Sequence, residues 1–317
     1  MNKIDSSLRI AFRDCLNVKP HETVLIVSDD KRAALAHKFY AAAQQYAREA
    51  LLIVMPEREN NGAEPPAAVA EAMRLCDAAF LVTTKSLSHT QARKRASAAG
   101  ARMASMPGIT EDMILRALGA DHQKMKQQCR RLIPKVSHAR QVRITTAAGT
   151  DLTFSLKGRT ARPDHGIIPE RGGFTNLPAG EVYVAPLEGT ANGVLVIDGS
   201  IADIWPMRKP ITIAIAQGYA VGAGKGRDAA RLWHILSRHG KPGLNVAEFG
   251  IGINPKARIT GNILEDEKVL GTIHIAFGDN SNFGGRVRVP SHQDGIVRRP
   301  TVTVDGKTLI DHGNLLI

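Results

Sequence analysis

The 317-residue chain is poor in aromatic residues and in cysteine. Aromatic side chains make up only 4% of it, which argues against a protein that stacks single-stranded nucleic acid on aromatic rings. Its three cysteines, Cys15, Cys76 and Cys129, are far apart and form no C-x-x-C pair, so the sequence predicts neither a zinc–thiolate site nor a disulfide framework. Three free thiols are typical of a reducing compartment.

Long apolar runs are also missing. No segment approaches the roughly 20 apolar residues that a transmembrane helix needs. The first 18 residues are polar and amphipathic and lack the apolar centre of a signal peptide. We therefore expect a cytoplasmic protein with no membrane partner.

Positive charge is in excess, with a formal net charge of +12. The basic residues are spread along the chain, with modest groups at 93–95, 124–131 and 286–299. Such a spread is typical of a basic enzyme with solvated lysines and arginines, and we expect no nucleic-acid partner. The positive field would instead attract an anionic small molecule.

Residues 1–135 alternate between strand-like and helix-like segments. Short apolar runs such as "ETVLIVSDD" and "AAFLVTTK" are separated by segments with helical periodicity, such as "RAALAHKFYAAAQQYAREA". Strands that alternate with helices indicate a parallel sheet with right-handed crossovers. The sequence therefore predicts an α/β, Rossmann-like N-terminal domain over residues 1–135.

The pattern changes near residues 134–138, and residues 136–317 are rich in strands. "QVRITTAAGTDLTFSLKG" is typical of a hairpin that turns at Gly149, and the C-terminal segment of one that turns at Asp305 and Gly306. One clear helix, "GRDAARLWHILSRHG", lies among the strands. We predict an α+β C-terminal domain over residues 136–317, with a largely antiparallel sheet that carries a metal site.

Five potential metal ligands lie in or beside the apolar segments of this second region: Glu181, Glu248, His274, His292 and Asp294. His292 and Asp294 are two residues apart, so an extended backbone directs both to one face. Two imidazoles and three carboxylates at one point would be costly without a cation. The mixture suits divalent transition metals better than calcium or magnesium, which prefer oxygen ligands.

Each of these residues alone has an ordinary explanation. Glu181 is also compatible with a solvated turn, Glu248 with a salt bridge, and His274 with a hydrogen-bonded core histidine. Together they are far more specific. His274, His292 and Asp294 would form a two-histidine, one-carboxylate face that suits iron(II), zinc, manganese or cobalt, and both glutamates added to it would form a bridged two-metal site.

The segments "NLPAGEVYVAP", "AEFGIGINP", "HIAFG" and "HQD" resemble metallo-aminopeptidases of the aminopeptidase T and aminopeptidase S type. The resemblance implies a two-domain homodimer with a dinuclear site, in which all five residues above would be the metal ligands. The catalytic tyrosine of that family is absent, because its place is held by Ser281. The chain is also similar to dioxygenases that open the ring of 2,5-dihydroxypyridine, which use one metal held by histidines and a carboxylate.

The leading hypothesis is a metal-dependent hydrolase of aminopeptidase type. It would remove N-terminal residues from short peptides, or hydrolyse a related small amide, with water activated by two zinc, cobalt or manganese ions. Glu248 would position or deprotonate that water. The alternatives are a mononuclear iron(II) ring-cleaving dioxygenase, which would act on a small molecule, and a non-catalytic metal-binding homologue.

Overall fold

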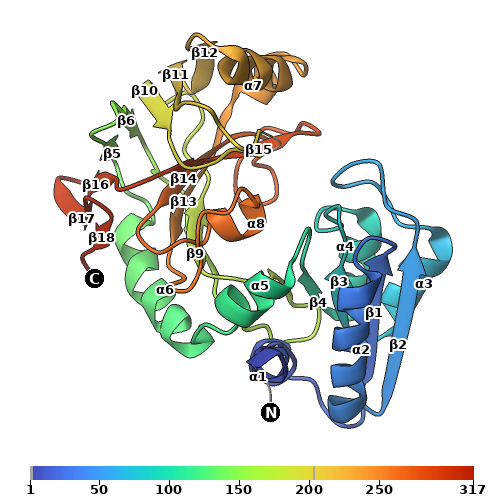
Figure 1. Ribbon diagram of the computed structural model, residues 1–317. Coiled ribbons are helices and arrows are strands. Elements are labelled where there is room, and N and C mark those ends of the chain that lie inside the picture. The colour runs from blue at the N-terminus through green and yellow to red at the C-terminus, as the bar shows by residue number, and fades with distance from the viewer. Residues whose placement is uncertain (1–2, 203) are drawn as a thin grey trace. The chain divides into compact units, whose positions relative to one another are not determined.

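The computed structural model describes residues 3–202 and 204–317, which form two compact units (Figure 1). The first unit comprises the chain up to Gln123 together with Asp164–Ala179, and the second comprises Lys124–Pro163 and Gly180–Ile317. The predicted boundary lies between residues 135 and 136. In the structure most of helix α6 (His122–Val136) belongs to the second unit, and Asp164–Ala179 returns to the first because it adds a strand to its sheet.

The first unit is built on a five-stranded sheet in the order β2-β1-β3-β4-β8, in which all neighbours are parallel. The strands are β1 (Thr23–Asp29), β2 (Glu49–Met55), β3 (Ala78–Val82), β4 (Arg102–Ser105) and β8 (Phe174–Asn176). Helices α2 (Ala33–Tyr46), α3 (Ala67–Leu75) and α4 (Gln91–Ala99) connect the first four strands in turn. The unit also contains α1 (Lys3–Arg9), α5 (Glu111–Met113) and π-helical turns at Ile10–Cys15 and Ile114–Leu118. The predicted α/β class with a parallel sheet is confirmed.

The second unit contains two sheets. The larger has the order β12-β11-β10-β6-β5-β16-β17-β18 and is antiparallel throughout. Its strands are β5 (Val142–Thr145), β6 (Asp151–Phe154), β10 (Asn192–Ile197), β11 (Ile211–Ala216), β12 (Tyr219–Ala223), β16 (Thr301–Val304), β17 (Lys307–Asp311) and β18 (Asn314–Leu315). The two predicted hairpins are the pairs β5–β6 and β16–β17.

The smaller sheet of the second unit has the order β15-β14-β13-β9-β7. Its strands are β7 (Arg162–Asp164), β9 (Glu181–Val184), β13 (Val246–Gly252), β14 (Ile273–Gly278) and β15 (His292–Val297). The four strands from β15 to β9 pair antiparallel, which confirms the predicted largely antiparallel character. The helical segments of this unit are α6, α7 (Arg227–Ser237), α8 (Ile263–Asp266) and a 3-10 turn at Lys241–Leu244. None of the helices in the described ranges is long and apolar enough to cross a bilayer.

Candidate metal centre

All five candidate ligands come from the smaller sheet of the second unit, and the structure brings them together. His274 Nε2 lies 3.3 Å from Glu181 Oε2 and 3.3 Å from Glu248 Oε1. His292 Nε2 lies 3.3 Å from Glu248 Oε2 and 3.4 Å from Asp294 Oδ1. The result is one continuous cluster, in which Glu248 joins the two imidazoles. That its members bind metal stays a prediction.

Strand register makes room for this cluster, because every candidate ligand is paired with a glycine or an alanine on the neighbouring strand. The pairs are Glu181 with Gly252, Glu248 with Ala276, His274 with Gly250, His292 with Gly278, and Asp294 with Ala276. A Cβ atom at Gly250 would overlap the His274 ring. Directly paired residues share a face of a sheet, so these small partners leave the space into which the ligand side chains converge.

The two histidine rings are fixed in different ways. His292 Nδ1 lies 2.8 Å from the carbonyl oxygen of Asp279 and donates to it, which leaves Nε2 directed at Glu248 and Asp294. His274 is fully buried, and within the described ranges its Nδ1 has no hydrogen-bond partner. Its orientation is therefore set by packing over Gly250. Both rings direct Nε2 into the cluster, as metal-bound histidines do.

The electrostatics of the cluster favour positive charge. Burial alone lowers the pKa of His274, but the hydrogen bond to Glu248 and the negative charges of Glu181, Glu248 and Asp294 outweigh burial and raise that pKa to about 9. Burial also opposes protonation of His292, yet Asp294 and Glu248 raise its pKa well above the ordinary value. Without a cation, protons on the two rings balance the carboxylates. A divalent cation would take their place.

The carboxylates respond in the opposite sense. Burial raises the pKa of Glu248, but hydrogen bonds from His274 and His292 more than reverse this effect and lower it. The pKa of Asp294 is likewise lowered, because the charge and the hydrogen bond of His292 outweigh burial. Both groups therefore stay ionised at neutral pH, which is the state that a metal ligand requires.

Two further charged residues belong to this cluster, Glu267 and Lys268, and the sequence pattern did not indicate either of them. Lys268 is fully buried, and its ammonium contacts Glu181 Oε1 and lies 2.7 Å from Glu267 Oε1. Burial raises the pKa of Glu267 to about 8, with Lys268 opposing this effect and Glu181 adding to it. Both residues lie in the run "EDEK" at 265–268. A run of four charged residues normally marks a solvated surface, and nothing in its spacing indicates burial.

Two overlapping groups in the cluster have the ligand types and the spacing of a metal site. Glu181, Glu248 and His274 form one, and Glu267, His274 and Asp294 form the other. Within each group the potential ligand atoms lie within 4.8 Å of one another. The described residues therefore include an arrangement of imidazole and carboxylate groups that could hold a metal ion.

Aromatic side chains border the cluster at His292. The Phe283 ring meets the His292 ring edge-on, with centroids 5.9 Å apart, and lies 5.7 Å from the Tyr183 ring. Ser281, at the place of the aminopeptidase tyrosine, donates from its backbone N–H and its hydroxyl to the Asp279 carboxylate. Its hydroxyl thus holds the loop before β15.

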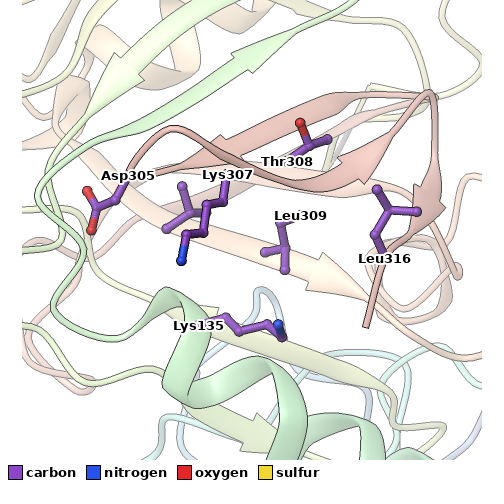
Figure 2. A pocket seen from close by; sticks show the side chains of 7 residues that line it. Lys135, Asp305, Lys307, Thr308, Leu309 and Leu316 are labelled. Carbon is purple, nitrogen blue, oxygen red and sulfur yellow. The ribbon is translucent and has the colours of Figure 1, made fainter.

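A separate cavity of about 300 Å³ lies between α6 and the C-terminal strands of the second unit (Figure 2). Lys135 and Lys307 line it together with Leu309 and Leu316, as Figure 2 shows. None of the candidate metal ligands contributes to this cavity. It is therefore not part of the metal cluster.

Comparisons with known proteins relate the chain to dioxygenases. The family model for 2,5-dihydroxypyridine 5,6-dioxygenase matches residues 5–317. A 2,5-dihydroxypyridine 5,6-dioxygenase of Pseudomonas putida strain KT2440 is 26% identical over 261 residues, which cover 77% of this chain and 73% of that protein. The similarity is spread over both units.

Two solved structures share the fold. The structure of 2,5-dihydroxypyridine dioxygenase from Pseudomonas putida KT2440 matches with a TM-score of 0.82 and 19% identity, covering 100% of this chain and 98% of the other. Wild-type AmpT from Thermus thermophilus matches with a TM-score of 0.75 and 17% identity, covering 99% of each chain. The resemblance to both groups is thus confirmed at the level of fold.

The leading functional hypothesis is wrong. A metallo-aminopeptidase hydrolase is overturned by the family match and by the curated relative, both of which are dioxygenases. The likeness to AmpT extends to the fold alone and carries no chemistry over to this chain. Because the match spans residues 5–317, the chain belongs to the 2,5-dihydroxypyridine 5,6-dioxygenase family.

Proposed function

We propose that this chain is a mononuclear iron(II) dioxygenase that opens the ring of 2,5-dihydroxypyridine or a close structural relative. The observation that carries the proposal is the family match over residues 5–317. This match supports the ring-cleaving dioxygenase, which was one of the alternatives drawn from the sequence. The second unit would supply the metal ligands.

The chemistry of the cluster fits iron(II). His274, His292 and Asp294 supply two imidazoles and one carboxylate, a ligand set that suits non-haem iron and leaves positions for substrate and oxygen. Glu248 hydrogen-bonds His274 and lies beside His292, so it would keep both Nε2 atoms aimed at one point. Glu181, whose Oε2 lies 3.3 Å from His274 Nε2, would add a further carboxylate beside the site. Bound iron(II) would supply the one-electron chemistry that allows oxygen to react with an organic ring.

The residues around the ligands have roles of their own. The Asp279 carbonyl fixes the tautomer of His292, which has to present an unprotonated Nε2. Ionised Glu248 accepts hydrogen bonds from His274 and His292, and its lowered pKa keeps it an anion that would orient both rings. Phe283 and Tyr183 form an aromatic border beside His292, against which a planar pyridine ring can pack edge-on or with an offset.

The test is oxygen consumption by protein purified without oxygen and loaded with iron(II). We expect stoichiometric loss of 2,5-dihydroxypyridine and oxygen, with both atoms of isotopically labelled oxygen found in the product by mass spectrometry. His292→Ala should abolish the reaction, and His312→Ala, at an exposed histidine of the same unit, should leave it unchanged. Iron-loaded protein that consumes no oxygen with any dihydroxypyridine would refute the proposal.

A further inference from the structure

Lys268 is the one buried ammonium in the described part of the metal cluster. It is fully buried, and it contacts Glu181 and Glu267. A buried lysine is costly unless carboxylates surround it. Here the ammonium contacts Glu181, which is itself a candidate ligand of a divalent cation, so the lysine and the metal ion would share one carboxylate.

The backbone holds Lys268 in place. Its N–H donates to the Glu265 carbonyl at 2.9 Å, and its own carbonyl accepts from the Asn254 N–H at 2.8 Å. At Gly252, the partner of Glu181 across the sheet, a Cβ atom would lie 2.8 Å from the carbonyl carbon of Lys268. The absence of that Cβ allows the segment after α8 to pack directly on β13. The ammonium is therefore anchored beside Glu181.

Lys268 contacts one carboxylate of each group that has metal-site spacing. Glu181 belongs to the group with Glu248, and Glu267 belongs to the group with Asp294, while His274 is common to both. Two divalent ions, one in each group, would need both carboxylates. One oxygen of each is already directed at the ammonium.

We propose that Lys268 acts as an internal cation that restricts the cluster to a single divalent metal ion. The inference rests on the proposed function, since it assumes that the cluster binds metal. A hydrolytic two-metal site and a mononuclear oxygenase site differ in the number of bound ions, and on this proposal Lys268 determines that number. Lys268 is on this account a specificity-determining residue and is not a metal ligand.

Charge balance supports this assignment. The cluster contains four carboxylates, Glu181, Glu248, Glu267 and Asp294. Lys268 and one divalent ion supply three positive charges, which the carboxylates can offset, whereas two divalent ions beside Lys268 supply five, which exceeds the four negative charges available and makes the buried site net positive. Replacement of Lys268 by a neutral side chain would match two ions to the four carboxylates. A second ion is thus disfavoured by repulsion from the ammonium and by loss of its ligands.

The experiment is a metal count with manganese(II) as the probe. Purified full-length protein is equilibrated with excess Mn²⁺, and bound metal is measured by elemental analysis and by electron paramagnetic resonance. We expect one ion per chain with an uncoupled spectrum for the wild type. Lys268→Met should bind two ions per chain and show the spin-coupled spectrum of a metal pair. Lys268→Arg, which keeps the charge, should remain at one.

Lys307→Met is the matched control, because Lys307 is an exposed lysine of the same unit, and it should bind one ion. Two ions per wild-type chain would overturn the inference without reliance on any variant. So would a Lys268→Met protein with a native circular dichroism spectrum that still binds one. A wild-type chain that binds no ion would instead overturn the proposed metal site, and this inference with it.

Discussion

Strands β1 and β13 are both seven residues long and both buried, yet their sequences serve different ends. β1, "TVLIVSD", contributes buried branched aliphatic side chains to the core of the first unit. β13, "VAEFGIG", gives three of its positions to Glu248, Gly250 and Gly252. Glycine in a strand adds no side-chain packing and weakens the strand, and a buried carboxylate adds a desolvation cost.

The comparison shows where stability and function lie in this molecule. The parallel sheet of the first unit is held by apolar packing that needs no ligand. The smaller sheet of the second unit gives up packing to hold a charged cluster, and a bound cation would restore part of that loss through linkage. Changes in β1 should therefore alter stability alone, and changes in β13 should alter metal binding first.

The largest expected effect follows from Glu248→Gln, which keeps the shape of β13 and removes the charge between the two imidazoles. We expect a loss of ring-cleaving activity on the order of 100-fold, because loss of this carboxylate weakens metal binding and frees both rings. Activity and iron content are measured together. Glu71→Gln, at an exposed ion pair of α3, is the control, and a Glu248→Gln protein within twofold of the wild type would contradict the role.

Gly250→Ala sharpens the contrast with β1. The new methyl group would overlap the His274 ring and displace Nε2, so we expect a 10- to 100-fold loss of iron affinity, a magnitude typical of lost ligand orientation. Leu25→Ala in β1 should instead cost about 2–5 kcal/mol of unfolding free energy, with metal content unchanged. Urea unfolding measures the unfolding free energy of both variants, and metal titration measures their iron affinity. Equal iron affinity in Gly250→Ala and the wild type would break the comparison.

The pH dependence of the metal-free protein is a third test. The folded state raises the pKa of His274 from 6.5 to about 9, so protonation of this ring stabilises the fold fully below pH 6.5. That stabilisation, up to roughly 3 kcal/mol, is lost as the pH rises through 9. Unfolding free energy measured in chelator should therefore fall from pH 6.5 to 9, and His274→Gln should flatten the fall. Added Mn²⁺ should stabilise more at high pH, because metal displaces the protons.

Much of this comparison could be predicted from sequence, because strand periodicity is a local signal. The apolar runs identified the parallel sheet, and Asp305 and Gly306, both with positive φ, form the predicted hairpin turn. The same two-residue period placed His292 and Asp294 on one face. The five candidate ligands were found because each lies in or beside an apolar strand, where a charged or imidazole group is unusual.

What could not be predicted depends on contacts between distant segments. Lys268 and Glu267 lie in a charged run whose burial is set by packing against Gly252, far away in sequence. β8 has only three residues, too few to show a period, so its return to the first sheet had no signal. The sequence could not distinguish a hydrolase from a dioxygenase, because the same imidazoles and carboxylates can bind either one metal ion or two.

The smallest expected effect concerns the aromatic border of the cluster. Phe283→Leu keeps an apolar side chain of similar size but removes the ring that meets His292 edge-on. Aromatic contacts of this kind contribute about 0.5–1.5 kcal/mol beyond burial, so KM for the dihydroxypyridine should rise about two- to tenfold. The kcat should stay within about twofold, because no metal ligand changes. Steady-state oxygen uptake separates the two constants. A fall in kcat at constant KM would place Phe283 in support of His292 and not in contact with substrate.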